Sequence, residues 1–130
     1  MNIKKIKLDS YGSKNGLLSV IESKDRLPFN IKRVFFINGD KNSKRGCHAH
    51  KKCTQFFLCL NKKIRIEFDD GKNKKICTIK NNNVGLLVPP KIWSSQIYLE
   101  KSTIMAVFCN LKYDENEYIR NYDEFLRIVN

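Results

Sequence analysis

The sequence predicts an all-β domain with a short helix near its C-terminus. Short apolar or alternating runs recur along most of the chain, and residues that favour turns separate them. Many short strands at regular spacing are typical of a barrel or a sandwich, of which the double-sheet jelly roll is one form. The 130 residues fit a single domain, residues 1–130, that can bury a core of its own.

The expected strands follow one another from residue 17 onward. Residues 17–22 and 32–37 are apolar runs, and the Asn-Gly-Asp step after the second run favours a turn. Residues 55–60 form a further apolar run. Residues 64–68 alternate between apolar and charged side chains, which is the pattern of a half-buried strand.

The second half of the chain continues this pattern. The Asp-Gly step that ends at Gly71 predicts a hairpin turn, and residues 75–80 form the return strand. The strand at residues 85–88 must end at the two prolines that follow it, because proline cannot donate a hydrogen bond to a neighbouring strand. The last strands are expected at residues 98–99 and 102–110.

The tail of the chain, residues 114–129, has a different period. Tyr118, Tyr122, Phe125 and Val129 recur at helical spacing, with acidic residues near the start of the segment and Arg127 near its end. Acidic residues at the first turn and a basic residue at the last turn suit the helix dipole. The tail therefore predicts a short C-terminal helix.

The net charge of +12 favours an anionic ligand. Lysine supplies 19 of the 25 basic residues, scattered in ones and twos, as in lysine- and asparagine-rich proteins of AT-rich genomes. No basic helix or arginine-rich arm is present, so we expect a small anionic substrate and no nucleic acid partner. No apolar run approaches the ~20 residues of a membrane span, and the N-terminus lacks the apolar region of a signal peptide. We therefore expect a cytoplasmic protein without a membrane partner.

The five cysteines are odd in number, and no two are spaced as Cys-x-x-Cys. This argues against a disulfide framework and against a zinc site built from cysteines. Free cysteine is among the residues most often buried, so we expect reduced thiols that are mostly buried.

His48 and His50 are the only histidines of the chain. In a strand their side chains would point to the same face, roughly 6.5–7 Å apart along the chain, and Cys47 would face the other way. Imidazoles exchange protons near neutral pH, so the pair suits either a metal site or an acid and base.

Two patches of the sequence resemble the cupins, namely residues 46–50 and residues 85–93. In metal-binding cupins the first patch supplies two histidines and a glutamate, and the second supplies another histidine. Here Thr54 and Gln55 stand where the glutamate would be, and Trp93 stands near the place of the last histidine. Two imidazoles and an amide make a poor site for a transition metal, so we expect no metal and favour acid/base use of the pair.

The chain is most similar to the sugar nucleotide 3,4-ketoisomerases, which are metal-independent cupins that act on dTDP-4-keto-6-deoxyglucose. The similarity covers roughly residues 30–127 and consists of motifs in a fixed order. These motifs are Arg-Gly-x-His-Ala-His-Lys-Lys, Gln-Phe-Phe-Leu-Cys-Leu, Asp-Asp-Gly, Val-Pro-Pro-x-x-Trp and Tyr-Asp-Glu-x-x-Tyr-Ile-Arg-Asn-Tyr. The resemblance implies a cupin jelly-roll barrel, a homodimer and no cofactor. It also implies a place in the biosynthesis of deoxyaminosugars for surface glycans such as lipopolysaccharide.

The reaction of this family needs two proton transfers. A base removes the proton of C3, and a second group delivers a proton to C4, through an enediolate. By analogy with the family, His48 is the base at C3 and His50 is its partner in proton transfer. The order of these two roles, the galacto or gluco configuration of the product at C4 and the nucleotide base remain open from the sequence.

Four more residues are candidates for substrate binding. Arg33 opens an apolar strand, where a guanidinium that points into a barrel needs an anion such as a diphosphate. Arg45 precedes the histidine pair and could contact phosphate or hold a loop. Gln55 could bond a sugar hydroxyl, and Trp93 could pack on the sugar or base at the mouth of the barrel.

A small single barrel is not expected to cover all the apolar side chains of the run at residues 17–21. Exposed strand edges are normally paired or protected, so we expect a homodimer that exchanges its N-terminal strand. Two other functions stay open from the sequence: a metal-dependent cupin enzyme, and a non-catalytic cupin that binds a sugar nucleotide.

Overall fold

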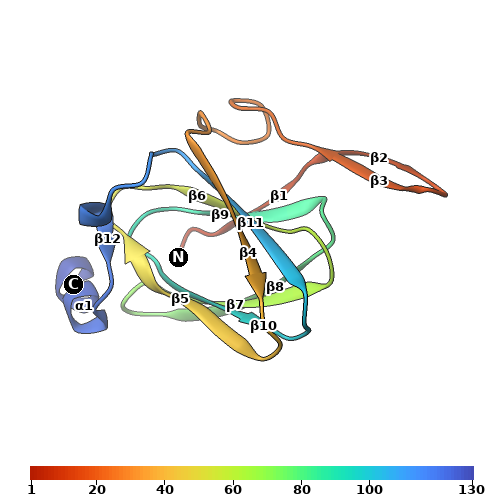
Figure 1. The fold of residues 1–130 in the computed structure, drawn as a ribbon. Helices are drawn as coiled ribbons and strands as arrows, with labels where there is room; N and C mark the ends of the chain where they lie inside the picture. Colours follow the sequence, from red (N-terminus) through yellow and green to blue (C-terminus); the bar gives the residue numbers. More distant parts are fainter.

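Two five-stranded sheets face each other and form a jelly-roll barrel in the computed structural model, which describes residues 1–130 (Figure 1). The first sheet has, in spatial order, the strands β1 (Lys4–Lys7), β9 (Val84–Val88), β6 (Gln55–Cys59), β11 (Thr103–Cys109) and β4 (Arg33–Gly39). The second sheet has the strands β12 (Tyr118–Ile119), β5 (Ser43–His50), β10 (Trp93–Tyr98), β7 (Lys63–Asp69) and β8 (Lys74–Lys80). All pairs within these two sheets are antiparallel.

The core of the barrel lies between the two sheets, because side chains of opposite character alternate along the strands. In β7, Ile64, Ile66 and Phe68 are buried, whereas Arg65 is exposed. Side chains of this inner set pack against each other across the sheets. At the end of β10, the ring of Tyr98 is wholly buried, and a Cβ atom on Gly39 would lie 2.1 Å from it. Glycine is therefore required at position 39.

The sequence predicts most of the strands within a few residues. The hairpin at Gly71 is confirmed: β7 pairs with β8, and the Asp70 carboxylate accepts hydrogen bonds from the backbone nitrogens of Lys72 and Asn73. The strand expected at residues 98–99 is wrong in extent, since β10 begins at Trp93. Its polar Ser-Ser-Gln step hides the strand pattern, although these three side chains are all buried.

The tail differs from the prediction at its start. Helix α1 (Tyr122–Val129) begins eight residues later than expected, and the side chain of Asn121 caps it by accepting a hydrogen bond from the backbone nitrogen of Glu124. The residues before it form the short 3₁₀ helix η1 (Glu115–Glu117) and strand β12. Tyr118 therefore lies in a strand that pairs with His50, not in the helix.

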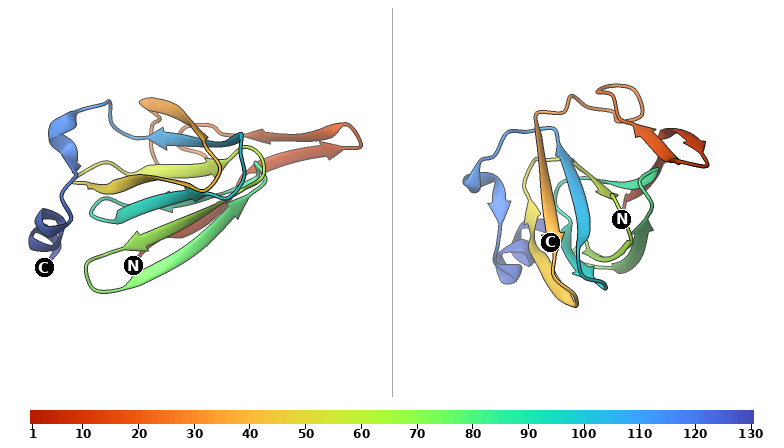
Figure 2. Two further views of the ribbon diagram at one scale, coloured as in Figure 1. Left: turned by 60° about the horizontal axis from the view of Figure 1, so that its bottom comes forward. Right: turned by 45° about the vertical axis from the view of Figure 1, so that its right-hand side comes forward.

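A separate hairpin stands out from the barrel near the N-terminus. It consists of β2 (Asp9–Ser13) and β3 (Gly16–Val20), and Figure 2 shows it projecting beyond the end of the barrel. Neither β1 nor β2 is predicted from the sequence, because the first is rich in lysine and the second is polar and largely exposed. The helices of the protein are too short or too polar to cross a membrane.

Candidate active site

A β-bulge in β5 sets the position of the histidine pair. Between Ser94 and Ser95 the register of β10 against β5 shifts, so that His48 pairs with Ser94 and Gly46 pairs with Ser95. Cys47 is the extra residue, and both Gly46 and Cys47 have positive φ angles, +83° and +61°. A Cβ on Gly46 would lie 2.7 Å from the side-chain nitrogen of Gln96, so this step of the bulge requires glycine.

The two imidazoles lie side by side on the inner face of β5. Their ring centroids are 5.2 Å apart, and the rings meet edge to face at 81°. The ring of Tyr118 packs against both, with its centroid 5.1 Å from that of His48 and 4.4 Å from that of His50. Cys47, which precedes them as the extra residue of the bulge, is exposed. The sequence expectation of a shared histidine face is therefore confirmed.

A cavity of about 370 Å³ opens beside His48 at the mouth of the barrel. It brings together His48 and three of the four residues that the sequence assigns to substrate binding, Arg33, Arg45 and Gln55. The rest of its wall comes from apolar side chains of the first sheet, from Gln96 of the second sheet, from Tyr113, and from Tyr118 and Arg120 of the tail.

The fourth residue, Trp93, does not line this cavity. Its ring packs against Tyr122 and Phe125, with centroid separations of 5.3 Å and 5.6 Å, so helix α1 lies against it. It borders a separate depression together with Asp69 and Tyr122. This packing places Trp93 outside the cavity that contains His48, and the sequence does not reveal it because the helix that contacts Trp93 lies about 30 residues later.

The cavity is positively charged at its rim. The guanidinium of Arg33 donates a hydrogen bond to the hydroxyl of Tyr118 at 3.0 Å and lies over the rings of Phe35 and Tyr113. Arg120 lies over the Tyr118 ring at 4.4 Å and forms an ion pair with Glu115. Neither Arg33 nor Arg45 has a carboxylate within ion-pair distance, so both guanidiniums are available to an anion.

Burial controls the charge of both histidines. Loss of solvent lowers the pKa of His48 to about 4, and the neighbouring His50 lowers it further, whereas a hydrogen bond to the Gly46 carbonyl opposes the shift. Burial also lowers the pKa of His50, and the hydrogen bond with Glu117 opposes that shift. Both imidazoles are therefore neutral at pH 7, which is the form that accepts a proton.

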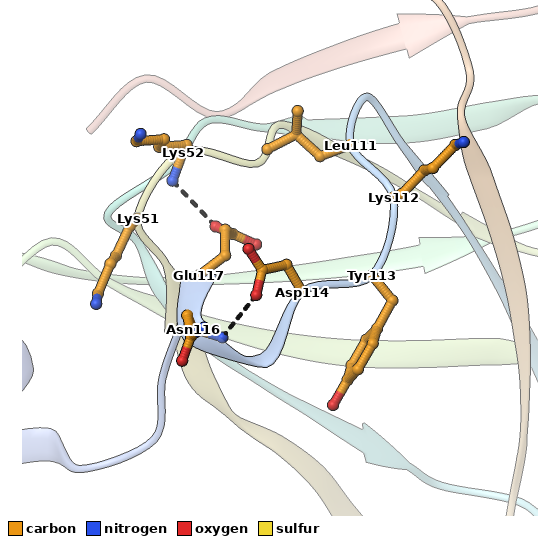
Figure 3. A pocket seen from close by; sticks show the side chains of 8 residues that line it. All are labelled: Lys51, Lys52, Leu111, Lys112, Tyr113, Asp114, Asn116 and Glu117. Atoms are coloured by element: carbon orange, nitrogen blue, oxygen red, sulfur yellow. Dashed lines mark hydrogen bonds between the residues drawn. The ribbon is translucent and has the colours of Figure 1, made fainter.

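Glu117 bonds His50 through the ring nitrogen Nδ1. Its Oε1 lies 2.6 Å from His50 Nδ1, and its Oε2 accepts hydrogen bonds at 3.0 Å from the backbone nitrogens of Lys52 and Cys53. Figure 3 shows the bond from Lys52. Burial alone would raise the pKa of Glu117, but the hydrogen bonds from Lys52, His50 and Cys53 lower it, so the carboxylate stays ionised.

Sequence reasoning misses Glu117, Tyr118 and Arg120 as site residues. The tail motif, which is part of the family resemblance, contains all three residues and could have pointed to them. The predicted helix, however, places their side chains differently from the 3₁₀ helix and strand that are found. Potential ligand atoms of His50, Cys53 and Glu117 lie within 4.8 Å of one another. In this arrangement the two oxygens of Glu117 already contact the imidazole and two backbone nitrogens.

Comparison with known proteins identifies relatives that match over nearly the whole chain. The family model described as "FdtA: WxcM-like, C-terminal" matches residues 1–130. TDP-4-oxo-6-deoxy-alpha-D-glucose-3,4-oxoisomerase from Aneurinibacillus thermoaerophilus is 40% identical over 130 residues, which cover 99% of this chain and 90% of that protein.

Two solved structures share the fold and more than a third of the sequence. One is a histidine-to-asparagine variant of the 3,4-ketoisomerase QdtA from Thermoanaerobacterium thermosaccharolyticum in complex with TDP-4-keto-6-deoxyglucose. It has a TM-score of 0.94 and 35% identity, covering 98% of this chain and 94% of that chain. The other is WlaRA, a TDP-fucose-3,4-ketoisomerase from Campylobacter jejuni, with a TM-score of 0.90 and 37% identity, covering 100% of this chain and 97% of that one. The fold, the ordered motifs and these matches confirm the resemblance, and the chain belongs to the FdtA family of sugar nucleotide 3,4-ketoisomerases.

Proposed function

We propose that the protein converts dTDP-4-keto-6-deoxyglucose into a dTDP-3-keto-6-deoxyhexose by proton transfer between C3 and C4. The observation that carries the proposal is the pair of neutral imidazoles beside a cavity whose rim holds two guanidiniums without carboxylate partners. The relatives named above support the substrate class, because one is named for this keto sugar and another is bound to it.

The reaction conserves atoms and electrons. His48 takes the proton of C3, the electron pair of that C–H bond forms a C3=C4 double bond, and the C4 oxygen takes the negative charge. A proton then passes from the C3 oxygen to the C4 oxygen, and a proton is returned to C4, so that C3 becomes the carbonyl carbon. The oxidation of C3 equals the reduction of C4, and the two imidazoles supply proton exchange for both steps.

Arg33 and Arg45 are proposed to bind the diphosphate. A guanidinium can donate two parallel hydrogen bonds to a phosphate, and both groups lie at the cavity that contains His48. Gln55 lies deeper in the same cavity, is buried, and is proposed to bond a sugar hydroxyl. Binding of dTDP should weaken as salt is added, because charge supplies much of the attraction.

The direct test is to incubate the protein with dTDP-4-keto-6-deoxyglucose in deuterated water and to follow the product by NMR. The spectrum reports activity, the carbon that exchanges and the configuration at C4 together. Replacement of either catalytic histidine, His48→Asn or His50→Asn, should slow product formation by roughly 10²-fold or more. Cys47→Ser is the matched control, because this exposed residue directly precedes His48 in the same strand. Near-wild-type turnover in a histidine variant would remove that histidine from its role.

The two other function classes make different predictions in the same experiment. A metal-dependent cupin would contain a stoichiometric transition metal and would lose activity when a chelator removes it. A non-catalytic binding protein would bind dTDP but leave the keto sugar unchanged. We expect turnover that chelators do not affect, and a 3-keto product that an aminotransferase can convert to a deoxyaminosugar for surface glycans.

We further propose that the protein is a homodimer in which the hairpin of β2 and β3 is the exchanged segment. Strand β1 pairs with β9 of its own chain, so the hairpin is the part free to reach another molecule. Tyr11 and Leu18 of the hairpin are 68% and 58% exposed, and Phe36 on the edge strand β4 is 62% exposed. Apolar surfaces of this kind are normally covered, and contact between the hairpin of one copy and β4 of another would cover both. Light scattering at micromolar concentration tests the dimer, and a fully active 15.3 kDa monomer would contradict it.

A further inference from the structure

The carboxylate of Glu117 is the one acidic group bonded to an imidazole of the site. It contacts Nδ1 of His50 at 2.6 Å, and both side chains are at least nine-tenths buried. The same side chain accepts hydrogen bonds from two successive backbone nitrogens, those of Lys52 and Cys53. Three donors therefore converge on one carboxylate, which is the arrangement that favours its ionised form.

The backbone of Glu117 is fixed as firmly as its side chain. Its carbonyl oxygen accepts a hydrogen bond from the nitrogen of Lys51 at 2.9 Å. On one side, Asp114 caps the turn of η1 by accepting a hydrogen bond from the Asn116 nitrogen, as Figure 3 shows. On the other side, β12 begins at once, and its first residue, Tyr118, pairs with His50. Glu117 is thus held against the strand that carries both histidines.

An ionised carboxylate can only accept, so the contact requires a proton on Nδ1 of His50. In the neutral imidazole the other nitrogen, Nε2, is then unprotonated and is the atom that can accept a proton. Nε2 of His50 is buried and bonds no protein group. Of the two ring nitrogens of His50, it is the one without a hydrogen-bond partner in the protein.

We propose that Glu117 is a positioning residue of the isomerisation, which acts through His50. It holds the Nδ1–H tautomer and the orientation of the ring, so that Nε2 accepts and returns the proton, and it stabilises the imidazolium that exists between these two steps. The inference rests on the proposed function, since it assigns to His50 a proton-transfer role in that reaction. The proton moves from substrate to Nε2 and back, so His50 ends the cycle in the neutral form in which it began, and the only redox change is the exchange between C3 and C4 of the substrate.

The variant Glu117→Gln tests the inference with little change of shape. Its amide oxygen can still accept from Lys52 and Cys53, but its NH₂ group then faces His50 and must donate to Nδ1. His50 is driven to the Nε2–H tautomer and can no longer accept at Nε2. We expect kcat to fall by roughly 10²-fold or more with KM nearly unchanged, as for loss of acid/base catalysis or of the correct tautomer. Glu124→Gln, an exposed glutamate on α1, is the matched control and should leave kcat unchanged.

The tautomer itself can be measured by ¹⁵N NMR of the imidazoles. Only two histidines contribute signals, and His48→Asn assigns them. Wild-type His50 should show a protonated Nδ1 and an unprotonated Nε2, and Glu117→Gln should reverse this. The shorter carboxylate of Glu117→Asp should keep the wild-type tautomer and regain part of kcat.

Two results would overturn the inference. One is a wild-type His50 with the Nε2–H tautomer, which decides the matter even if the Gln variant does not fold. The other is a folded Gln variant with wild-type kcat. These outcomes differ from failure of the proposed function, in which the wild-type protein would leave the keto sugar unchanged whatever the tautomer of His50.

Discussion

The two terminal segments of the chain attach to the barrel in opposite ways. The C-terminal tail, residues 114–129, lies along the barrel, buries Phe125 completely and contributes Tyr118 and Arg120 to the wall of the cavity. The N-terminal hairpin, residues 9–20, leaves Tyr11 and Leu18 exposed and projects away from the sheets (Figure 2). Each segment carries large apolar side chains, but only the tail buries one of them completely within one chain.

This difference separates two kinds of structural role. The tail is part of the domain and of its chemistry, because its pairing with β5, the burial of Phe125 and the packing of Tyr118 on the histidines all form within a single copy. The hairpin has a complete backbone ladder between its own two strands, but its apolar side chains lack partners. Changes in the tail should therefore alter stability and catalysis, whereas changes in the hairpin should alter association.

The largest effect on stability is expected where helix α1 packs against the barrel. Phe125 is wholly buried with Ala49 and Ile119, so Phe125→Ala leaves a cavity and should lower the free energy of unfolding by about 3–5 kcal/mol. Urea denaturation measures this change. Ile128→Ala on the exposed side of the same helix is the control, and it should change stability by no more than about 0.5 kcal/mol. Equal effects of the two substitutions would mean that the helix does not pack as described.

The tail also contributes to the burial of His48, which makes stability depend on pH. The pKa of His48 is about 4 in the folded protein and 6.5 in an exposed histidine, so between these values the unfolded chain binds a proton that the folded chain does not. This contribution to the free energy of unfolding is complete above pH 6.5 and is lost as the pH falls to about 4, by at most about 3 kcal/mol. Urea denaturation of the wild-type protein and of His48→Asn at several pH values in this range should show a smaller loss of unfolding free energy in the variant. Parallel curves of unfolding free energy against pH would contradict the assignment to His48.

The hairpin should affect association instead. Leu18→Asp places a charge on its exposed apolar face and should raise the dimer dissociation constant by about 10- to 100-fold, the cost of losing one buried leucine. Analytical ultracentrifugation across a range of concentrations measures this constant. Asn15→Asp adds the same charge at the hairpin tip and serves as the control. A dissociation constant that is unchanged in Leu18→Asp would place the dimer interface elsewhere.

The smallest effect is expected where the tail meets β4. Tyr118→Phe removes the hydroxyl that accepts a hydrogen bond from Arg33 and should cost about 0.5–1.5 kcal/mol of stability. The rings that pack on the histidines stay in place, so the histidine tautomers should not change in the NMR spectrum. A much larger loss of stability would show that the hydroxyl does more than join the tail to the strand.

Local patterns predict the barrel well, because burial on one face imposes a period of two that is visible in the sequence. Residues 64–68 and the Asp-Gly hairpin are examples. The tail shows the limit of this reasoning. Tyr118, Tyr122 and Phe125 have helical spacing, yet Tyr118 lies in a strand, because its pairing with His50 joins residues 68 positions apart. The same kind of distant contact brings Glu117 to His50 and α1 to Trp93, and no local period can report it.

The ring of Tyr98, which packs on Gly39, affects how a ligand can enter and leave the barrel. It lies at the end of β10 opposite to the residue that pairs with His48, so this buried ring fills the interior at that end of the barrel. A molecule that reaches His48 therefore has to enter and leave on the side of the cavity that Tyr98 does not fill. Substrate and product therefore use the same opening of the cavity. A bound product then blocks the next substrate, and tighter binding of the part that the two share slows product release more than it speeds substrate binding.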